Sequence, residues 1–450
     1  MNIFRGSMRI NFSIVCCVAA ICIGFNALAE EAHNTSLSKK STYLINFEEV
    51  FNLALSSSKE YLALNKEVES KIILKDKEDK YYYPEASINS ETTEYWGSPT
   101  PDSGETHELI LYANSKLYGS GVADRIAASQ MALDAGNISL EAQEILVYYT
   151  VLTYLTKIEL TREYEKSSNE LRDEIETYYL KQVNSTNEGV STKSDAMEAK
   201  LSVAEFDESV YSVVSNIEQY FKKLAEETGL DLGLNEEHAE DKIGIDYKRI
   251  KPLLMRDVRD ITAEELIANN AELQKTQKTL KSSLHTARST RERFVVEIVT
   301  ESHLMTNGDS GEHYYGDTDE SYVQLNLELD LFNHGLQSDQ NSSFKIYEAE
   351  KLRFDKQFKL SMDQFKTNVT NYNQQIIKRQ KTAEQIEILA GLIENQKEEI
   401  YTDKVTYKDI VESIGKLNSA KQTLLNIDLE LFDTLYELET LKSAKVLPAL

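Results

Sequence analysis

The clearest pattern of apolar and polar positions lies between residues 323 and 331, where the two kinds of side chain alternate strictly. The apolar positions are Val323, Leu325, Leu327, Leu329 and Leu331. Polar or acidic residues fill every position between them. Because successive side chains of a strand point to opposite faces, the segment predicts a strand with one apolar and one polar face. A strand of a soluble sheet that packs on a core shows the same alternation of apolar and polar residues as a membrane strand. This segment alone therefore does not distinguish a soluble sheet from a membrane strand.

Similar patterns predict two series of elements in the same order. The first is a helix at 47–80, strands at 84–95 and 106–117, a long helix at 122–181 and a returning helix at 195–228. The second is a helix at 263–291, strands at 294–304 and 322–332, a long helix at 336–400 and a returning helix at 410–442. A helix over 122–181 would be about 90 Å long, far longer than a globular core. We therefore expect a mainly α fold with few strands.

The returning helices repeat an apolar residue every seven positions. These residues are Val210, Ile217 and Leu224 in the first, and Leu417, Leu424, Leu431 and Leu438 in the second. The spacing predicts coiled-coil packing, although an ordinary helical bundle gives a similar stripe.

The two series also match in sequence. Sliding the chain along itself until residue 117 meets residue 331 pairs LYGSG with LFNHG, Thr192 with Thr406, and Asp195 with Asp409. Several matches at one offset predict an internal duplication. The repeats would be residues 47–230, with strand pair 84–117 and helical hairpin 122–228, and residues 263–442, with strand pair 294–332 and hairpin 336–442. The polar stretch 231–262 would link them.

Residues 1–29 have the features of a signal peptide. They contain Arg5 and Arg9, an apolar run at 12–25, and the small-residue pattern Ala27-Leu28-Ala29 that a signal peptidase cleaves. An uncleaved membrane anchor would need a longer apolar run, of about 20 residues. All three cysteines lie inside this segment, so the mature chain is expected to have no disulfide framework. Residues 30–46 would form an N-terminal extension and 443–450 a C-terminal tail.

Aromatic residues bracket the predicted strands. Next to the helices these are Tyr81, Tyr82, Tyr83, Tyr118 and Phe332, and at the loop end Tyr95, Trp96, Tyr314, Tyr315 and Tyr322. Such paired girdles mark the two faces of a bilayer, so we expect a membrane β-barrel with Val323, Leu325, Leu327 and Leu329 facing lipid. A closed barrel needs at least about eight strands, whereas three chains with four strands each would supply 12. A trimer follows if the barrel is correct.

Charge and motif content argue against several classes of function. The formal net charge is −26. Binding to nucleic acid, a polyanion, needs a basic face on the protein, so a chain this acidic is not expected to bind it. The seven histidines show no metal-ligand spacing, and no nucleophile motif or phosphate-binding loop is evident. We therefore expect neither an enzyme nor a bound metal or cofactor.

Several short motifs together resemble a known family. They are SKEY at 58–61, YPEA at 83–86, LYGSG at 117–121, GVSTKSD at 189–195 and NAEL at 270–273. No single motif is specific, but their order, duplication and spacing resemble the TolC-like outer-membrane efflux proteins (outer membrane factors) over almost the whole mature chain.

The resemblance implies a trimeric duct in the outer membrane of a Gram-negative bacterium. Its barrel would continue into a large periplasmic coiled-coil barrel of α-helices. It would be the passive exit duct of a tripartite efflux or type I secretion system for small molecules or polypeptides. An inner-membrane transporter would drive transport through a periplasmic adaptor, or membrane fusion protein, and the duct itself would have no catalytic residues.

The resemblance also assigns residues at the hairpin tips. Gly189, Thr192, Asp403 and Thr406 match the tips, and Asp409, Glu412 and Asp195 match positions at the periplasmic aperture. The chain has Asp403 where glycine is usual, and Val405 where some members carry an arginine that ties the hairpins, so Lys404 or Lys408 would take that role. The other interpretation of each carboxylate is a solvated helix start favoured by the helix dipole.

The main rival is a trimeric coiled-coil surface adhesin or structural envelope protein. That class usually has its barrel at the C-terminus, whereas here two predicted strand pairs are far apart in the chain. The sequence leaves the transported substrate open, with drugs, metal ions and a secreted polypeptide as candidates.

Overall fold

The computed structural model describes residues 47–94, 105–228, 262–290, 294–307, 320–329, 334–400 and 405–442. The predicted signal peptide 1–29, extension 30–46 and tail 443–450, and all of the linker 231–262 except its last residue, lie outside the described residues. Asp403 and the aromatic residues Tyr95, Trp96, Tyr314, Tyr315 and Phe332 also lie outside them.

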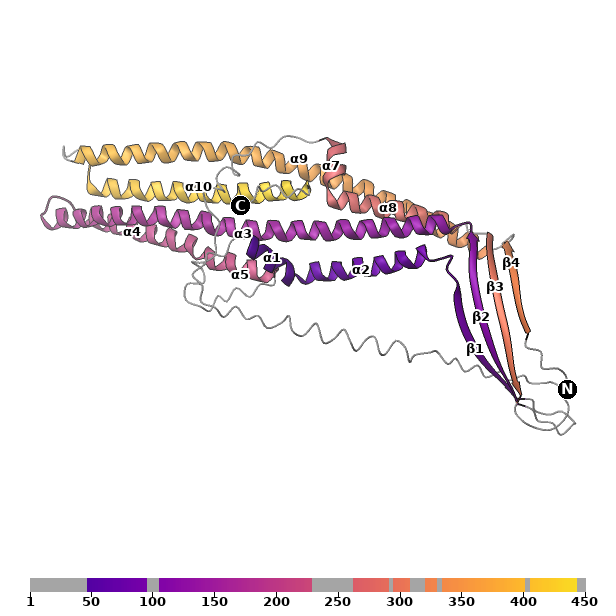
Figure 1. The fold of residues 1–450 in the computed structure, drawn as a ribbon. Helices are drawn as coiled ribbons and strands as arrows, with labels where there is room; N and C mark the ends of the chain where they lie inside the picture. Colours follow the sequence, from indigo (N-terminus) through magenta and orange to yellow (C-terminus); the bar gives the residue numbers. More distant parts are fainter. Residues whose placement is uncertain are drawn as a thin grey trace, which may run out of the picture. The chain divides into compact units, whose positions relative to one another are not determined.

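The helices and strands follow the predicted order twice (Figure 1). The first series is α1 (Phe47–Ser57), α2 (Lys59–Asp79), β1 (Glu85–Glu94), β2 (Glu105–Gly119), α3 (Val122–Asn187), α4 (Lys193–Val214) and α5 (Asn216–Thr228). The second is α7 (Ala263–Asn269), α8 (Ala271–Ser289), β3 (Phe294–Asn307), β4 (Glu320–Leu329), α9 (His334–Glu399) and α10 (Tyr407–Leu441). The mainly α class with four strands is confirmed, whereas the duplication and the trimeric barrel stay predictions.

Three helices that were expected to be continuous are interrupted. The breaks fall at Ser58, Ser215 and Asn270. Asn270 has an extended backbone; its Oδ1 accepts from the Leu273 backbone N at 2.8 Å, and its Nδ2 donates to the Leu441 carbonyl at 2.8 Å. It therefore caps α8 and also satisfies a carbonyl at the end of α10. A single polar residue in an amphipathic pattern does not reveal such a break.

The four strands form one antiparallel sheet in the order β1-β2-β3-β4, within a unit of residues 71–132 and 280–349. Ile88 pairs with Leu111, and Ile298 with Leu325, so apolar side chains of neighbouring strands share a face. An irregularity at 116–118 shifts the register between β2 and β3. Among the described helices, none is long and apolar enough to cross a membrane.

The second unit contains most of the hairpin α3–α4 and most of the hairpin α9–α10. Its core has two apolar clusters, and α10 contributes to both. Residues 410–417 of α10 pack in the cluster near the hairpin turns with Ile175 and Phe206, and residues 425–438 pack in the other with Leu155 and Phe221. Of the leucines spaced by seven, Leu417, Leu431 and Leu438 are buried and Leu424 is half-buried. The apolar stripe of α10 is thus a packing face.

Candidate functional site

A turn stabilised by hydroxyl groups joins α3 to α4. Gly189 has φ +76°, a left-handed conformation that suits glycine. Thr186 Oγ1 and Ser191 Oγ are 2.7 Å apart, and Gln182 Nε2 donates to Ser191 Oγ at 2.8 Å. Gly189 therefore lies at the tip of the first hairpin.

The two returning helices begin with the same cap. Asp195 Oδ2 accepts from the Thr192 hydroxyl at 2.7 Å, and the Asp195 backbone N donates back to Thr192 Oγ1 at 3.2 Å. Asp409 Oδ2 accepts from the Thr406 hydroxyl at 2.7 Å and from its backbone N at 2.8 Å. Each threonine and aspartate form a capping box, which satisfies backbone groups that the helix start leaves unpaired. Both carboxylates are thus held in place by their own helices.

Lys408 connects the two hairpins. Its ammonium group forms an ion pair with Glu198 and lies 3.8 Å from Asp195 Oδ1, both on α4, and 3.9 Å from Glu412 Oε1 on its own helix. Its backbone N donates to Gln182 Oε1 of α3 at 3.2 Å. The hydrogen bond with Glu198 raises the pKa of Lys408, and the bonds from Thr192 lower the pKa of Asp195. Both shifts favour the charged forms, so the contact is ionic at neutral pH.

Aromatic rings reinforce this contact between the hairpins. The rings of Tyr178 on α3 and Tyr407 on α10 lie 6.3 Å apart. Lys181 Nζ lies 4.6 Å from the Tyr178 ring and 6.0 Å from the Tyr407 ring. A cation near two rings adds a modest electrostatic attraction.

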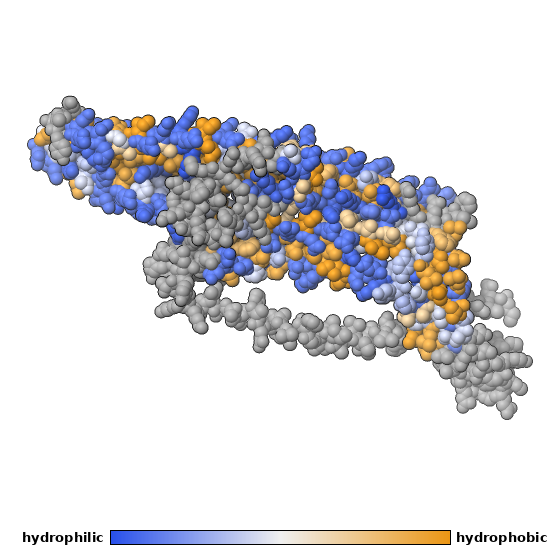
Figure 2. Space-filling view, turned by 45° about the horizontal axis from the view of Figure 1, so that its top comes forward, coloured by the Kyte–Doolittle hydropathy of each residue, from blue (hydrophilic) through white to orange (hydrophobic). Residues whose placement is uncertain are grey.

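The other candidate surface is the apolar face of the sheet. Val323, Leu325, Leu327 and Leu329 are between 57% and 73% exposed, and Leu327 pairs with Val296 across the β3–β4 ladder. Figure 2 shows apolar side chains gathered on the strands. A contiguous exposed apolar surface marks a place where another apolar phase or partner binds.

The opposite face of the sheet is mostly polar, and its polar side chains are bonded to one another. Glu297 accepts from Asn114 at 3.0 Å and from Asn326 at 3.3 Å, so one carboxylate joins three strands. Glu301 accepts from the Tyr322 hydroxyl and lies 2.6 Å from His303 Nε2. These bonds hold the polar side chains of neighbouring strands in place. Such a hydrogen-bonding surface is compatible with contact with water.

Some of the aromatic residues predicted to form girdles lie among the described residues. Next to the helices, Tyr82, Tyr83 and Tyr118 are exposed, with Tyr83 the most exposed. Tyr81 instead packs between Lys116 Nζ, 4.8 Å from its ring, and the Arg125 guanidinium, at 4.6 Å. At the far end of β4, Tyr322 is exposed.

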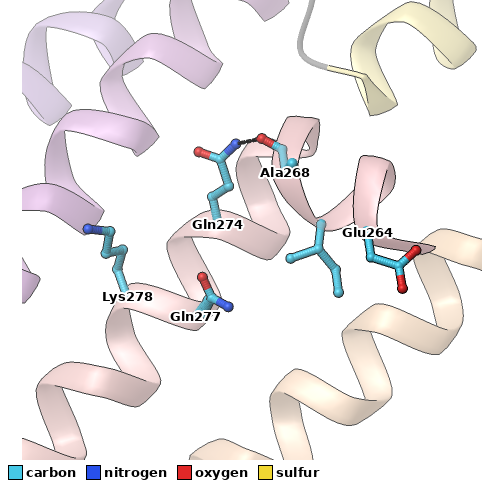
Figure 3. Close-up of a pocket in the computed structure, with 6 residues that line it drawn as sticks. Glu264, Ala268, Gln274, Gln277 and Lys278 are labelled. Carbon is cyan, nitrogen blue, oxygen red and sulfur yellow. Dashed lines mark hydrogen bonds between the residues drawn. The ribbon is translucent and has the colours of Figure 1, made fainter. Parts of the chain in front are cut away.

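The hollows of the second unit are shallow. One of about 460 Å³ lies between α7 and α8 and is lined by Glu264, Ile267, Ala268, Gln274, Gln277 and Lys278 (Figure 3). Gln274 donates to the Ala268 carbonyl, and Lys278 pairs with Asp134 at 2.7 Å. In the part of the chain that the structure describes, no group of three or more His, Cys, Asp or Glu side chains is placed to hold a metal ion.

Comparisons with known proteins identify the fold. No family model and no curated protein matches the sequence. The solved structure of CusC, described in terms of transmembrane channel formation, superposes with a TM-score of 0.72 at 11% identity, covering 90% of this chain and 95% of CusC. The outer membrane protein VceC of Vibrio cholerae superposes with a TM-score of 0.70 at 13% identity, covering 88% of this chain and 96% of VceC. The CmeC outer membrane channel of Campylobacter jejuni superposes with a TM-score of 0.67 at 12% identity, covering 88% of this chain and 85% of CmeC.

The chain has the fold of these outer-membrane channels. The resemblance carried by its short motifs is therefore confirmed at the level of the fold. At identities this low the sequence comparison finds nothing, because a fold of long helices and two-faced strands accepts many sequences with the same apolar pattern.

Within this outer-membrane-channel fold, Asp195 and Asp409 are each bonded within the capping box of their own helix. Asp195 and Glu412 also lie within 4 Å of Lys408 Nζ. Gly189 lies in the first turn, and Asp403 lies outside the described residues. Sequence reasoning did not identify Glu198 or Gln182. Glu198 stands one helical turn after Asp195, and that spacing was the available signal.

Proposed function

We propose that the chain is the outer-membrane channel subunit of a tripartite efflux or type I secretion system. Three copies would form a barrel of about 12 strands. The helices would form a periplasmic tube that an adaptor links to an inner-membrane transporter. Small molecules or polypeptides would leave through this passive duct, which has no catalytic role. The observation that carries the proposal is the four-stranded sheet with an exposed apolar face and a hydrogen-bonded polar face.

The edges of the sheet support the trimer. Within the described residues, β1 and β4 each pair on one side, and an open edge is a template for another chain. The helices next to these edge strands expose large apolar side chains: Ile72, Ile73 and Leu74 on α2, and Ile346 on α9. Neighbouring copies would pair β4 with β1 and cover these side chains.

Export and assembly test the proposal. We expect the mature chain to begin at Glu30 and to migrate from outer-membrane fractions as a trimer until heated. N-terminal sequencing and electrophoresis of heated and unheated samples measure this. A monomer in the soluble periplasm would contradict the proposal, and a trimer whose helices are digested by protease added to intact cells would favour the adhesin.

We propose that Lys408 holds the periplasmic end closed by tying α10 to Asp195 and Glu198 on α4. Lys408→Ala removes the cation of this contact, so ion conductance through purified trimers is expected to rise several-fold. Lys416→Ala is the matched control, because Lys416 is an exposed lysine on the same helix. Equal conductance of the two variants would show that Lys408 does not restrict the opening.

We propose further that Asp409 and Glu412, repeated in three chains, form an acidic ring at the aperture. The double variant Asp409→Asn and Glu412→Gln removes the charge while asparagine still accepts the capping bonds from Thr406. Cation selectivity and block by multivalent cations from the periplasmic side are expected to fall, because charged rings set selectivity in channels.

The matched control for the acidic ring is Glu384→Gln with Glu387→Gln, which removes two exposed glutamates with the same spacing on α9. Single-channel recording compares the variants. If both double variants keep the selectivity of the unchanged protein, Asp409 and Glu412 are helix-start carboxylates and nothing more.

A further inference from the structure

A buried polar layer crosses the second unit at Asn418 of α10. Asn418 is 1% exposed, and its Oδ1 accepts from Ser168 Oγ at 2.9 Å and from the Tyr164 hydroxyl at 3.3 Å, both on α3. Its Nδ2 donates to Ser209 Oγ of α4 at 2.9 Å. Both polar atoms of the amide are thus bonded across helices, in a buried environment where losing such bonds is costly.

This layer lies between the two apolar clusters. On α10, Leu417 is the last residue of the cluster near the hairpin turns, and Leu425 is the first residue of the other. Apolar packing has no strong directional preference, so leucine and isoleucine contacts alone allow neighbouring helices to slide. An amide bonded to hydroxyl groups on two helices has its partners at only one alignment. A single buried asparagine sets helix register in coiled coils by this means.

A different buried polar residue ties α10 to α9. Asp428 accepts from Arg379 Nε at 2.5 Å and from Nη2 at 3.4 Å, and both side chains are largely buried. Asn418 therefore contacts the first hairpin, while Asp428 contacts the other helix of its own hairpin. The two contacts act on different pairs of helices.

We propose that Asn418 fixes the register between the two hairpins, and that the α9–α10 hairpin shifts as one body when this layer is broken. The Arg379–Asp428 pair keeps α9 and α10 aligned during the shift. The proposal does not depend on the proposed channel function, because it concerns only how four helices align.

Distances between spin labels test the proposal on the full-length protein. One pair of labels, at Asn169→Cys and Ser419→Cys, reports the α3–α10 alignment. The other, at Gln385→Cys and Ser419→Cys, reports the α9–α10 alignment. All three positions are exposed. Labelled chains are assembled with an excess of unlabelled chain, so that only pairs within one chain contribute to the signal.

Asn418→Leu is expected to add a second α3–α10 distance, because sliding the hairpin by roughly one helical turn, about 5 Å along the helix axis, changes the separation of the two labels, while the α9–α10 distance stays single. Asn426→Leu is the matched control, because Asn426 is exposed on the same helix, and it should leave both distances single. The double variant Ser168→Ala and Ser209→Ala keeps Asn418 and removes two of its partners, so it should give the same second distance without an added apolar side chain.

Two results would overturn the proposal. One is a single α3–α10 distance in both the Asn418→Leu and the Ser168→Ala/Ser209→Ala proteins, which would make the layer a packing feature. The other is equal broadening of both distances, which would mean that the helices loosen generally and no hairpin moves as a body.

Discussion

Replacing Leu327 by arginine is expected to destabilise the membrane-inserted protein by about 2–4 kcal/mol, the cost of a basic side chain on the lipid face of a barrel near the bilayer midplane. Leu327 is exposed on the apolar face of β4 and pairs with Val296 of β3. If that face contacts lipid, the guanidinium loses its water there. Urea titration of the protein in lipid vesicles measures the change.

The matched control is Glu328→Arg, the next residue of the same strand. Glu328 belongs to the polar face, which would line the aqueous lumen of the proposed barrel, so the same arginine should have a much smaller effect there. The fraction of heat-sensitive trimer in outer-membrane fractions gives a second measure of assembly. Comparable losses for Leu327→Arg and Glu328→Arg would refute the assignment of the two faces.

The second large effect is expected from Arg379→Leu, which should lower the free energy of unfolding by about 3–5 kcal/mol. The side chains of Arg379 and Asp428 are 12% and 7% exposed. Removing the arginine takes away the Arg379–Asp428 ion pair, which offsets part of the cost of burying the Asp428 carboxylate. Thermal and denaturant unfolding of the helical signal measure the loss.

Two further variants define the origin of this loss. Arg379→Leu combined with Asp428→Leu should recover most of the stability, because the buried charge is then absent as well. Arg353→Leu removes an arginine that pairs with Glu350 on the surface of the same helix, and should cost at most about 1 kcal/mol. Equal losses for Arg379→Leu and Arg353→Leu would show that burial of the pair is energetically unimportant.

The sequence was most informative where one period governs a whole segment. Strict alternation over 323–331 predicted β4 and its apolar face, because a strand has no other way to place those leucines. The spacing of threonine and aspartate at 192–195 and 406–409 also marked two helix starts. The structure places those starts at Lys193 and Tyr407 and not at the predicted 195 and 410, because the threonine itself is the cap.

Contacts between segments far apart in the chain could not be predicted in the same way. The lysine at 408 was one of two candidates to tie the hairpins, but its contact with Glu198 depends on how α10 packs against α4. Asn418 and Asp428 stand in a helix with many polar residues, and periodicity alone does not show which of these are buried. A polar residue can be buried where it has hydrogen-bonding partners on other helices. Which residues become its partners depends on how the helices pack, and periodicity does not show this.

Conduction by the purified trimer is the most direct test of the proposed function. Heat-sensitive trimers from outer-membrane fractions are added to planar lipid bilayers, and ion current is recorded before and after heating. We expect discrete conducting steps from unheated trimers, loss of these steps on heating, and fewer insertion events per amount of protein for the destabilised Leu327→Arg protein. A stable trimer that inserts into the bilayer and carries no current, with or without Lys408→Ala, would contradict the proposal that this chain forms a channel.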